Sequence, residues 1–496
     1  MTRKKKFFLN TSTALIKQIV SLICGFVLPR YILLYYGSGI NGLVTSVTQF
    51  LGFISFLEMG IGPVIQSNLY KPLADKNDDE ISKIVSSSEK FFRRIATIFL
   101  GYIVVLIIIF PIFINGEYGF WFTGSLLIII AISTFAQYYF GITYQLLLNA
   151  DQRSYVQMTM QIVTILLNTV VSVLLMKLGF SIQVVKLSTA IIYLLRPIGQ
   201  SIYVHHHYDI NKEIKYTGEP IKQKWNGFAQ HLAAVVVQNT DVAILSVMST
   251  LTNVSIYSVY YNVVYGINNT VLTMVTGLES LWGNMLAKKE MGKLRETFET
   301  VESIMHMGCT FLFSATAILI VPFIKVYTDG ITDANYIAPV FGAMLTAAYG
   351  IQCLRVPYFR IIKAAGHYKQ TQKGAIIQMI VNLTVSIILV YKLGLVGVAV
   401  GTLVCMLYHT TYFAWYLRKN ILNRKFIFYI KHMLLDAVAV VICALCCQFF
   451  EMGSVTYVAW IILAVKVAVV CLVVCCGLNM IFYKNKIIGV LKLLKK

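Results

Sequence analysis

Residues 235–250 read VVVQNTDVAILSVMST, an apolar stretch that carries Gln238, Asn239 and Asp241 in its middle. A carboxylate near the centre of a bilayer costs about 2.5–3.5 kcal/mol on insertion scales. Such residues therefore usually face a cavity or a polar partner inside the protein. The stretch predicts a membrane helix, and Asp241 is its candidate functional residue.

The rest of the chain is also strongly apolar. Of its 496 residues, 58% are hydrophobic and only 13% are charged, and the mean hydropathy is +0.73. Apolar runs of about 18–25 residues recur along the whole length, each long enough to cross about 30 Å of hydrocarbon. Because the runs are continuous rather than alternating, they predict helices and exclude a membrane β-barrel. The expected fold class is an all-α polytopic membrane protein.

We expect about fourteen transmembrane helices, arranged as two six-helix lobes around a central cavity and followed by two C-terminal helices. Their approximate limits are 8–34, 38–69, 92–115, 119–149, 155–177, 182–205, 225–249, 253–286, 302–326, 335–362, 371–391, 395–417, 429–450 and 455–483.

Basic residues identify the side of the membrane. The N-terminus, six links and the C-terminal tail together hold 33 of the 42 Lys and Arg residues, whereas the opposite links hold only Lys177 and Lys392. By the positive-inside rule, both termini lie in the cytoplasm of a plasma-membrane protein. The net charge of +21 matches anionic lipid headgroups, so no nucleic-acid partner is expected. Lys17 interrupts the first apolar run and no cleavage pattern follows, which favours a retained helix over a signal peptide.

Two short patterns suggest an internal duplication. MKLG at 176–179 and YKLG at 391–394 follow the fifth and eleventh expected helices, 215 residues apart. LNAD at 148–151 and KAAG at 363–366 share that offset. We therefore expect parallel repeats. The expected domains are an N-terminal lobe, a cytoplasmic linker, a second lobe, and helices 13 and 14 with a basic tail, at residues 1–206, 207–224, 225–418 and 419–496.

The sequence carries no recognisable catalytic motif. It lacks the phosphate-binding loop of nucleotide hydrolases and the His-Glu-x-x-His motif of metalloenzymes, so no cofactor or metal is expected. His205–His207 are interpreted as a headgroup-facing link, and the cysteines of the last two helices as apolar packing groups. The expected external links are too short for the active site of a membrane glycosyltransferase or polymerase. We expect a transporter rather than an enzyme.

Charged residues within the expected helices are the candidate site residues. Seven are basic and four are acidic: Lys17, Arg30, Lys186, Arg196, Lys325, Arg355 and Lys466, and Glu58, Asp241, Glu279 and Asp436. Snorkelling toward the headgroups can explain Lys325, Arg30 and Lys186. The surplus of cations points to an anionic cargo, and arginine suits phosphate because its planar fork donates two parallel hydrogen bonds.

Four expected helices, the first, second, seventh and eighth, carry polar side chains at helical spacing. Such stripes either bond helices to one another or line a water-filled cavity. Their matching positions in the two halves favour a shared cavity. On the eighth helix, Tyr261 and Tyr265 offer flat faces suited to sugar rings, and packing with interfacial anchoring is an equal alternative.

Three segments carry a family resemblance: LNTSTALIKQIVSLICGFVLPRYILLYYGSGINGLVTSV, FLEMGIGPVIQSNLYKPLADKNDDEISKIV and QNTDVAILSVMSTLTNVSIYSVYYNV. They resemble the Wzx-type polysaccharide flippases of the multidrug/oligosaccharidyl-lipid/polysaccharide (MOP) exporter superfamily. This resemblance implies alternating access for an undecaprenyl-diphosphate-linked oligosaccharide, with the polyprenyl tail in the lipid bilayer and a polymerase and glycosyltransferases as possible partners. In related lipid II flippases a groove near the last two helices holds the tail, and 429–450 and 455–483 correspond to it.

The resemblance also implies roles for particular residues. Lys17, Arg30 and Glu58 belong to the cavity wall of the first lobe, and Asp241 and Glu279 to that of the second. Arg196 and Arg355 are added to the expected cavity from their depth in the sequence of their helices. Lipid II flippases carry more arginines there, which favours a different glycolipid for this chain.

Asp241 is the candidate for coupling transport to an ion gradient. We expect it to titrate or to pair with a cation, with a state that differs between the two access states. The alternative is a static ion pair between helices. A cation-coupled multidrug exporter of the same superfamily is the rival function, and the excess of membrane cations weighs against it.

Overall fold

The computed structural model describes residues 3–58, 60–114, 117–211, 228–275 and 277–494. Most of the expected linker, residues 212–224, lies outside these ranges. Over the described residues the chain is helical and contains no strand. This result confirms the all-α fold class.

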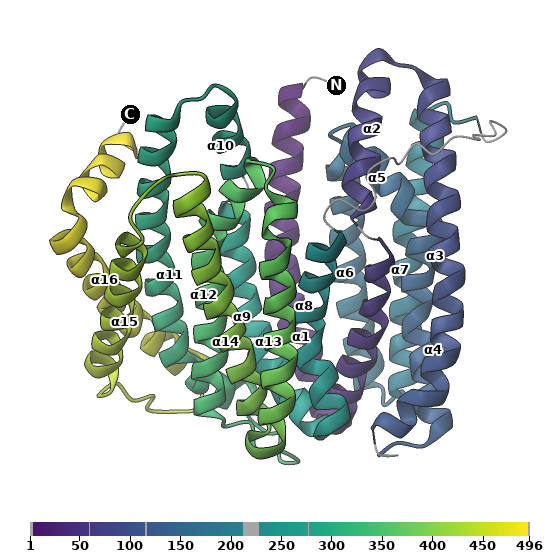
Figure 1. Cartoon of the computed structure of the whole chain (residues 1–496). Coiled ribbons are helices and arrows are strands. Elements are labelled where there is room, and N and C mark those ends of the chain that lie inside the picture. Colours follow the sequence, from purple (N-terminus) through teal and green to yellow (C-terminus); the bar gives the residue numbers. More distant parts are fainter. Residues whose placement is uncertain (1–2, 59, 115–116, 212–227, 276, 495–496) are drawn as a thin grey trace. The chain divides into compact units, whose positions relative to one another are not determined.

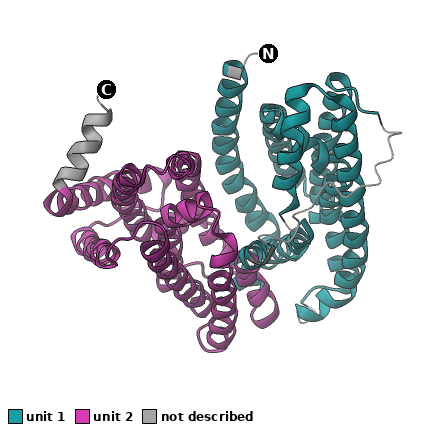
Figure 2. Ribbon diagram, turned by 45° about the horizontal axis from the view of Figure 1, so that its top comes forward, with its two compact units in different colours: residues 1–235, 250–255 teal, residues 236–249, 256–496 magenta. Residues whose placement is uncertain are grey.

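The chain divides into two compact units (Figure 2), residues 1–235 with 250–255 and residues 236–249 with 256–496. The elements before the division are α1 (Arg3–Gly52), η1 (Phe53–Glu58), α2 (Ile61–Asp75), α3 (Asp78–Phe113), α4 (Phe120–Ala136), η2 (Gln137–Gly141), α5 (Ile142–Ala150), α6 (Ser154–Lys177) and α7 (Ile182–His207). The boundary between the units falls within the next two helices, α8 (Phe228–Met248) and α9 (Leu251–Met274). The remaining elements are α10 (Leu278–Ala287), α11 (Met291–Tyr327), α12 (Pro339–Ala364), α13 (Tyr368–Leu393), α14 (Leu395–Asn420), α15 (Ile427–Cys447) and α16 (Tyr457–Leu494).

Eleven helical segments of the described chain are long and apolar enough to cross a membrane. The first of them, Lys4–Glu58, joins two expected helices, but Gly37 interrupts it with a φ of 84°. The polar helices α9 and α12 are not among the eleven, yet they occupy the places of the eighth and tenth expected helices. Each of the fourteen expected helices therefore corresponds to a helical segment (Figure 1).

The two units repeat a buried polar ladder. Asn168 and Ser172 on α6 are 2% and 1% exposed, and Asn382 and Ser386 on α13 are both fully buried. The two pairs are separated by the same 214 residues. Identical side chains at one offset on corresponding helices are the pattern that an internal duplication leaves.

The links that precede these helices repeat as well. Gln152 and Gly366 both have positive φ, 57° and 72°. The backbone N–H of Arg153 donates to Leu148 O at 2.7 Å, and that of His367 donates to Ile362 O at 3.2 Å. These links therefore match at an offset of 214, one residue less than the sequence pattern predicts, so that Asp151 corresponds to Ala365 rather than Gly366.

Side-chain contacts at the ends of the repeated helices follow the same rule. Arg153 donates to the Tyr203 hydroxyl at 3.2 Å, and His367 contacts the Tyr416 hydroxyl at 3.0 Å. The two contacts are related by offsets of 213 and 214 residues. Both units thus tie the start of one helix, α6 or α13, to the end of the next, α7 or α14.

Gly42 lets α1 approach the first turn of α9 at backbone contact. A Cβ atom on Gly42 would lie 1.8 Å from the Leu251 carbonyl oxygen, which is backbone and cannot rotate away. Next to it, the Asn41 amide donates to Ser255 Oγ at 2.8 Å. Glycine is therefore required at this crossing for close packing.

We expect Gly42→Ala to destabilise the protein by about 1–3 kcal/mol, the usual cost of overpacking. Thermal unfolding of the purified protein in detergent measures the loss. Gly25→Ala is the matched control on the same helix, because nothing lies within 4 Å of its added Cβ. Equal melting temperatures for the two variants would contradict the close approach.

Candidate functional site

Asp241 lies in a buried site built by four helices of unit 2. Its side chain is on α8, and the residue is 3% exposed. The Tyr257 hydroxyl on α9 donates to Oδ2 at 2.9 Å, and the Thr402 hydroxyl on α14 lies 2.7 Å from Oδ2 and 3.0 Å from Oδ1. Within the described ranges no basic side chain forms an ion pair with this carboxylate, so the static ion pair considered for Asp241 is not observed.

Unused oxygen atoms surround this carboxylate. Asn382 on α13 donates through its amide nitrogen to the Thr402 hydroxyl at 3.3 Å, and its Oδ1 is buried without a hydrogen-bond partner. Ser386 Oγ, one turn further along α13, is also buried without a partner. Carboxylate, amide and hydroxyl oxygens are the ligands of hard cations. The site can hold either a proton on Asp241 or a small cation among these oxygens.

No group of three or more His, Cys, Asp or Glu residues in the described chain is arranged to hold a metal ion. The Asp241 site differs from such a group because most of its oxygens come from neutral side chains. A neutral shell around one carboxylate favours a monovalent ion over a divalent one, since a single negative charge balances a single positive charge.

A tyrosine stack leads away from Asp241 along α9. The ring centroids of Tyr257 and Tyr261 are 5.7 Å apart, and those of Tyr261 and Tyr265 are 5.3 Å apart. Tyr257 is 3% exposed, whereas Tyr265 is 40% exposed. The predicted residues Tyr261 and Tyr265 therefore connect the buried carboxylate to an accessible surface of unit 2.

Lys17 on α1 and Arg196 on α7 form the second part of the candidate site, in unit 1. Both are half-buried, and they lie close enough to interact electrostatically. Arg196 Nε donates to Thr164 Oγ1 at 2.7 Å, and the guanidinium lies 3.7 Å from the Tyr193 ring centroid. Its Nη2 is buried without a partner. Neither cation has an acidic partner among the described residues, so together they offer an unneutralised positive site.

The other predicted residues are dispersed. Glu58 at the end of η1 accepts a hydrogen bond from Tyr138. Arg30 lies on α1 and is half-buried. Arg355 on α12 contacts the His409 imidazole on α14.

Glu279 is tied to two basic residues at the end of α12. Its carboxylate lies 3.0 Å from Arg360 and 3.2 Å from Lys363. These two basic residues belong to the predicted cytoplasmic link 360–373. The contacts therefore place Glu279 near the expected cytoplasmic end of unit 2, where the sequence pattern had suggested membrane depth.

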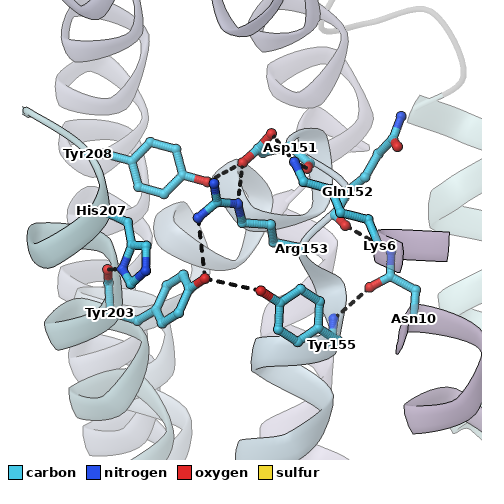
Figure 3. Close-up of polar contacts among 9 residues, drawn as sticks. All are labelled: Lys6, Asn10, Asp151, Gln152, Arg153, Tyr155, Tyr203, His207 and Tyr208. Atoms are coloured by element: carbon cyan, nitrogen blue, oxygen red, sulfur yellow. Dashed lines mark hydrogen bonds and ion pairs between the residues drawn. The ribbon is translucent and has the colours of Figure 1, made fainter. Parts of the chain in front are cut away.

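A polar cluster that the sequence analysis did not single out joins α1 to the α5–α6 link (Figure 3). Asp151 accepts hydrogen bonds from Lys6 at 2.8 Å, from Arg153 at 2.7 Å and from the Tyr208 hydroxyl at 2.6 Å. Burial and the hydrogen bond to Asp151 raise the pKa of Tyr208, which keeps its phenol protonated as a donor. The cluster fixes the start of α1 to the ends of α5 and α7.

Asp151 and Lys6 lie in segments that read as solvated charged links, so their pairing had no distinguishing signal in the sequence. A second missed pair is buried in unit 2. Arg424, between α14 and α15, binds the Glu302 carboxylate on α11 with two nitrogens, and Tyr358 donates to the same carboxylate. The side chains of Glu302 and Arg424 are 1% and 4% exposed.

These features define a polytopic, internally repeated membrane protein with isolated charges inside its helical units. The structure is similar to the lipid II flippase MurJ in its inward closed conformation, with a TM-score of 0.72 and 14% identity over 97% of this chain and 100% of that chain. It is also similar to an inward-facing MATE-family multidrug resistance transporter of the MOP superfamily, with a TM-score of 0.60 and 12% identity over 81% and 96% of the two chains.

The bent form of the Vibrio cholerae MATE transporter VcmN matches with a TM-score of 0.54 and 12% identity over 84% of this chain and 98% of that chain. No family model and no curated protein matches the sequence. At these identities the similarity establishes the fold, which is that of MOP-superfamily transporters.

Proposed function

We propose that the protein is a flippase that moves an undecaprenyl-diphosphate-linked oligosaccharide from the cytoplasmic to the outer leaflet of the cell membrane. The observation that carries the proposal is the unneutralised pair of Lys17 and Arg196 in unit 1. The MurJ-like fold supports it, because that neighbour is a lipid II flippase. The product would supply cell-surface polysaccharide synthesis, with a polymerase and glycosyltransferases as partners.

The cargo chemistry follows from the two cations. The diphosphate would bind Arg196 through its free Nη2 and Lys17 as a point charge, and these interactions strengthen when water is excluded. The sugars would stack on the exposed end of the Tyr261–Tyr265 pair, while the polyprenyl tail stays in lipid. In this proposal the lobes, residues 1–206 and 225–418, flank a central cavity, and both termini are cytoplasmic.

Asp241 would couple this movement to an ion gradient by alternating access. A bound ion can shift the equilibrium between two conformations only if it binds one of them more tightly. A buried carboxylate with neutral donors meets that condition, because any rearrangement of α8, α13 and α14 changes its oxygen shell. The protein itself would have no enzymatic activity.

The alternative is a cation-coupled multidrug exporter, which the similarity to MATE transporters supports. Asp241 would serve that function equally well. The cations of unit 1 argue against it, since they repel cationic drugs.

Mass spectrometry of polyprenyl-linked glycans in cells that lack the protein separates the two functions. An impermeant sugar-modifying enzyme reports the leaflet. The flippase proposal predicts a lipid-linked oligosaccharide that accumulates on the inner leaflet, together with loss of surface polymer. Unchanged glycolipids combined with reduced dye efflux would support the exporter.

Arg196→Gln is expected to lower the rate of glycolipid translocation about 10–100-fold, because a hydrogen bond to a charged group contributes about 1.5–3 kcal/mol. Lys17→Gln should act in the same direction, and the double variant less than additively, since both cations bind one anion. Lys325→Gln is the control, because Lys325 is an exposed cation at the end of α11. Normal translocation in both single variants would exclude this pair as the diphosphate site.

A further inference from the structure

A buried acid–base pair that transport does not use joins α11 to α15. His306 Nδ1 on α11 lies 2.5 Å from Asp436 Oδ2 on α15, and Thr310 Oγ1 donates to Asp436 Oδ1 at 2.7 Å. His306 is 1% exposed and Asp436 is 8% exposed. In unit 2, α15 and α16 both pack against α11 (Figure 1). The pair is therefore a polar contact within an otherwise apolar interface.

The groups around the pair come from every element packed against it. From α11, α12, the α14–α15 link, α15 and α16 they are Glu302 and Cys309, Tyr358, Arg424, Tyr429 and His432, and Tyr483 and Cys475. Glu302 is already neutralised by Arg424. His432 stacks between His306 at 4.7 Å and Tyr483 at 4.4 Å. This arrangement leaves protonated His306 as the counter-ion of Asp436.

Removal of one proton breaks this balance. With His306 protonated, both members are charged, bonded to each other and shielded from lipid. Without that proton, Asp436 is a buried carboxylate that keeps only a neutral Thr310 donor and a neutral imidazole. Burying a charge without an opposite charge is far more costly than burying a matched pair. The α11–α15 interface is thus matched to one protonation state.

We propose that the His306–Asp436 pair is a proton-binding site that fastens α15 to α11, and that release of its proton loosens α15 and α16 from the rest of unit 2. This site is separate from Asp241, shares no residue with it, and does not depend on the identity of the cargo. Imidazole is the side chain that titrates near neutral pH, so the site responds over a physiological range.

The test uses the full-length protein in detergent, with melting temperatures measured between about pH 6 and about pH 9. The wild type should lose several degrees as the pH rises. His306→Gln should have a low melting temperature with little pH dependence, because glutamine bonds to Asp436 but cannot hold the proton. His206→Gln, which removes an exposed histidine at the end of α7, should retain the wild-type slope.

A second variant decides the matter where His306→Gln does not fold. His306→Leu with Asp436→Leu replaces the pair by apolar side chains, and such replacements are often neutral or stabilising. It should fold and show a flat pH profile. Hydrogen–deuterium exchange locates the effect, with faster exchange expected in residues 427–447 of the wild type at high pH. A wild-type pH slope in the double variant, or faster exchange confined to other helices, would overturn the proposal.

Discussion

Asp241→Asn is expected to abolish ion-coupled transport, lowering its rate by at least about 100-fold, while the amount of folded protein stays the same. Asparagine has nearly the same shape and keeps one oxygen to accept from Thr402 or Tyr257. It loses the charge, and with it the capacity to bind a proton or a cation. A 100-fold loss corresponds to about 2.7 kcal/mol in the barrier, which one charged interaction in a buried site can supply.

The measurement is translocation of fluorescent glycolipid in vesicles with an imposed sodium or proton gradient. Ligand binding also raises stability, so a sodium-dependent increase in melting temperature that is absent from Asp241→Asn would identify the ion. Glu279→Gln is the matched control, since it neutralises a carboxylate that already has two cationic partners. Normal transport by Asp241→Asn would exclude Asp241 from coupling.

Arg424→Met is expected to lower the free energy of unfolding by about 3–5 kcal/mol, the largest stability loss that we predict. It leaves Glu302 as a buried carboxylate with only the Tyr358 hydroxyl as donor. Burial alone would lower the pKa of Arg424, but the hydrogen bonds and charge of Glu302 raise it, so the guanidinium is charged in the folded protein.

Thermal or denaturant unfolding measures this loss. Lys425→Met is the control, because Lys425 is the exposed neighbour of Arg424 in the same link. Glu302→Leu introduced into Arg424→Met should recover part of the stability, since it removes the unpaired carboxylate. A double variant that is less stable than Arg424→Met would show that the two residues do not act as a pair.

The fold could be predicted from the sequence because hydrocarbon thickness fixes the length of an apolar run. The fourteen expected segments are helical for that reason, including the polar α9 and α12. Gly37 could not be identified as the break between the first two helices, because its backbone conformation depends on the packing of α1. The repeat was found, but its offset at the α5–α6 link was wrong by one residue, since three-letter matches do not define register.

The candidate site was predictable only in part. A lone carboxylate in an apolar run is visible in the sequence, which is how Asp241 was found. Its partner Thr402 is 161 residues away and is an ordinary hydroxyl among many. The opposite difficulty applies to Glu302 and Arg424, which read as ordinary charges at the cytoplasmic side. Burial turns them into an ion pair, and burial is a property of the tertiary packing.

The duplicated ladder of asparagine and serine has a consequence for energetics. In unit 2 this ladder adjoins Asp241, whereas Asn168 and Ser172 of unit 1 have no carboxylate bonded to them among the described residues. An ion coupled through this ladder would therefore move with a stoichiometry of one per cycle. One elementary charge crossing a membrane potential of 100 mV releases about 2.3 kcal/mol. That energy sustains roughly a fiftyfold concentration ratio of the cargo between the two leaflets, apart from any contribution of the ion gradient itself.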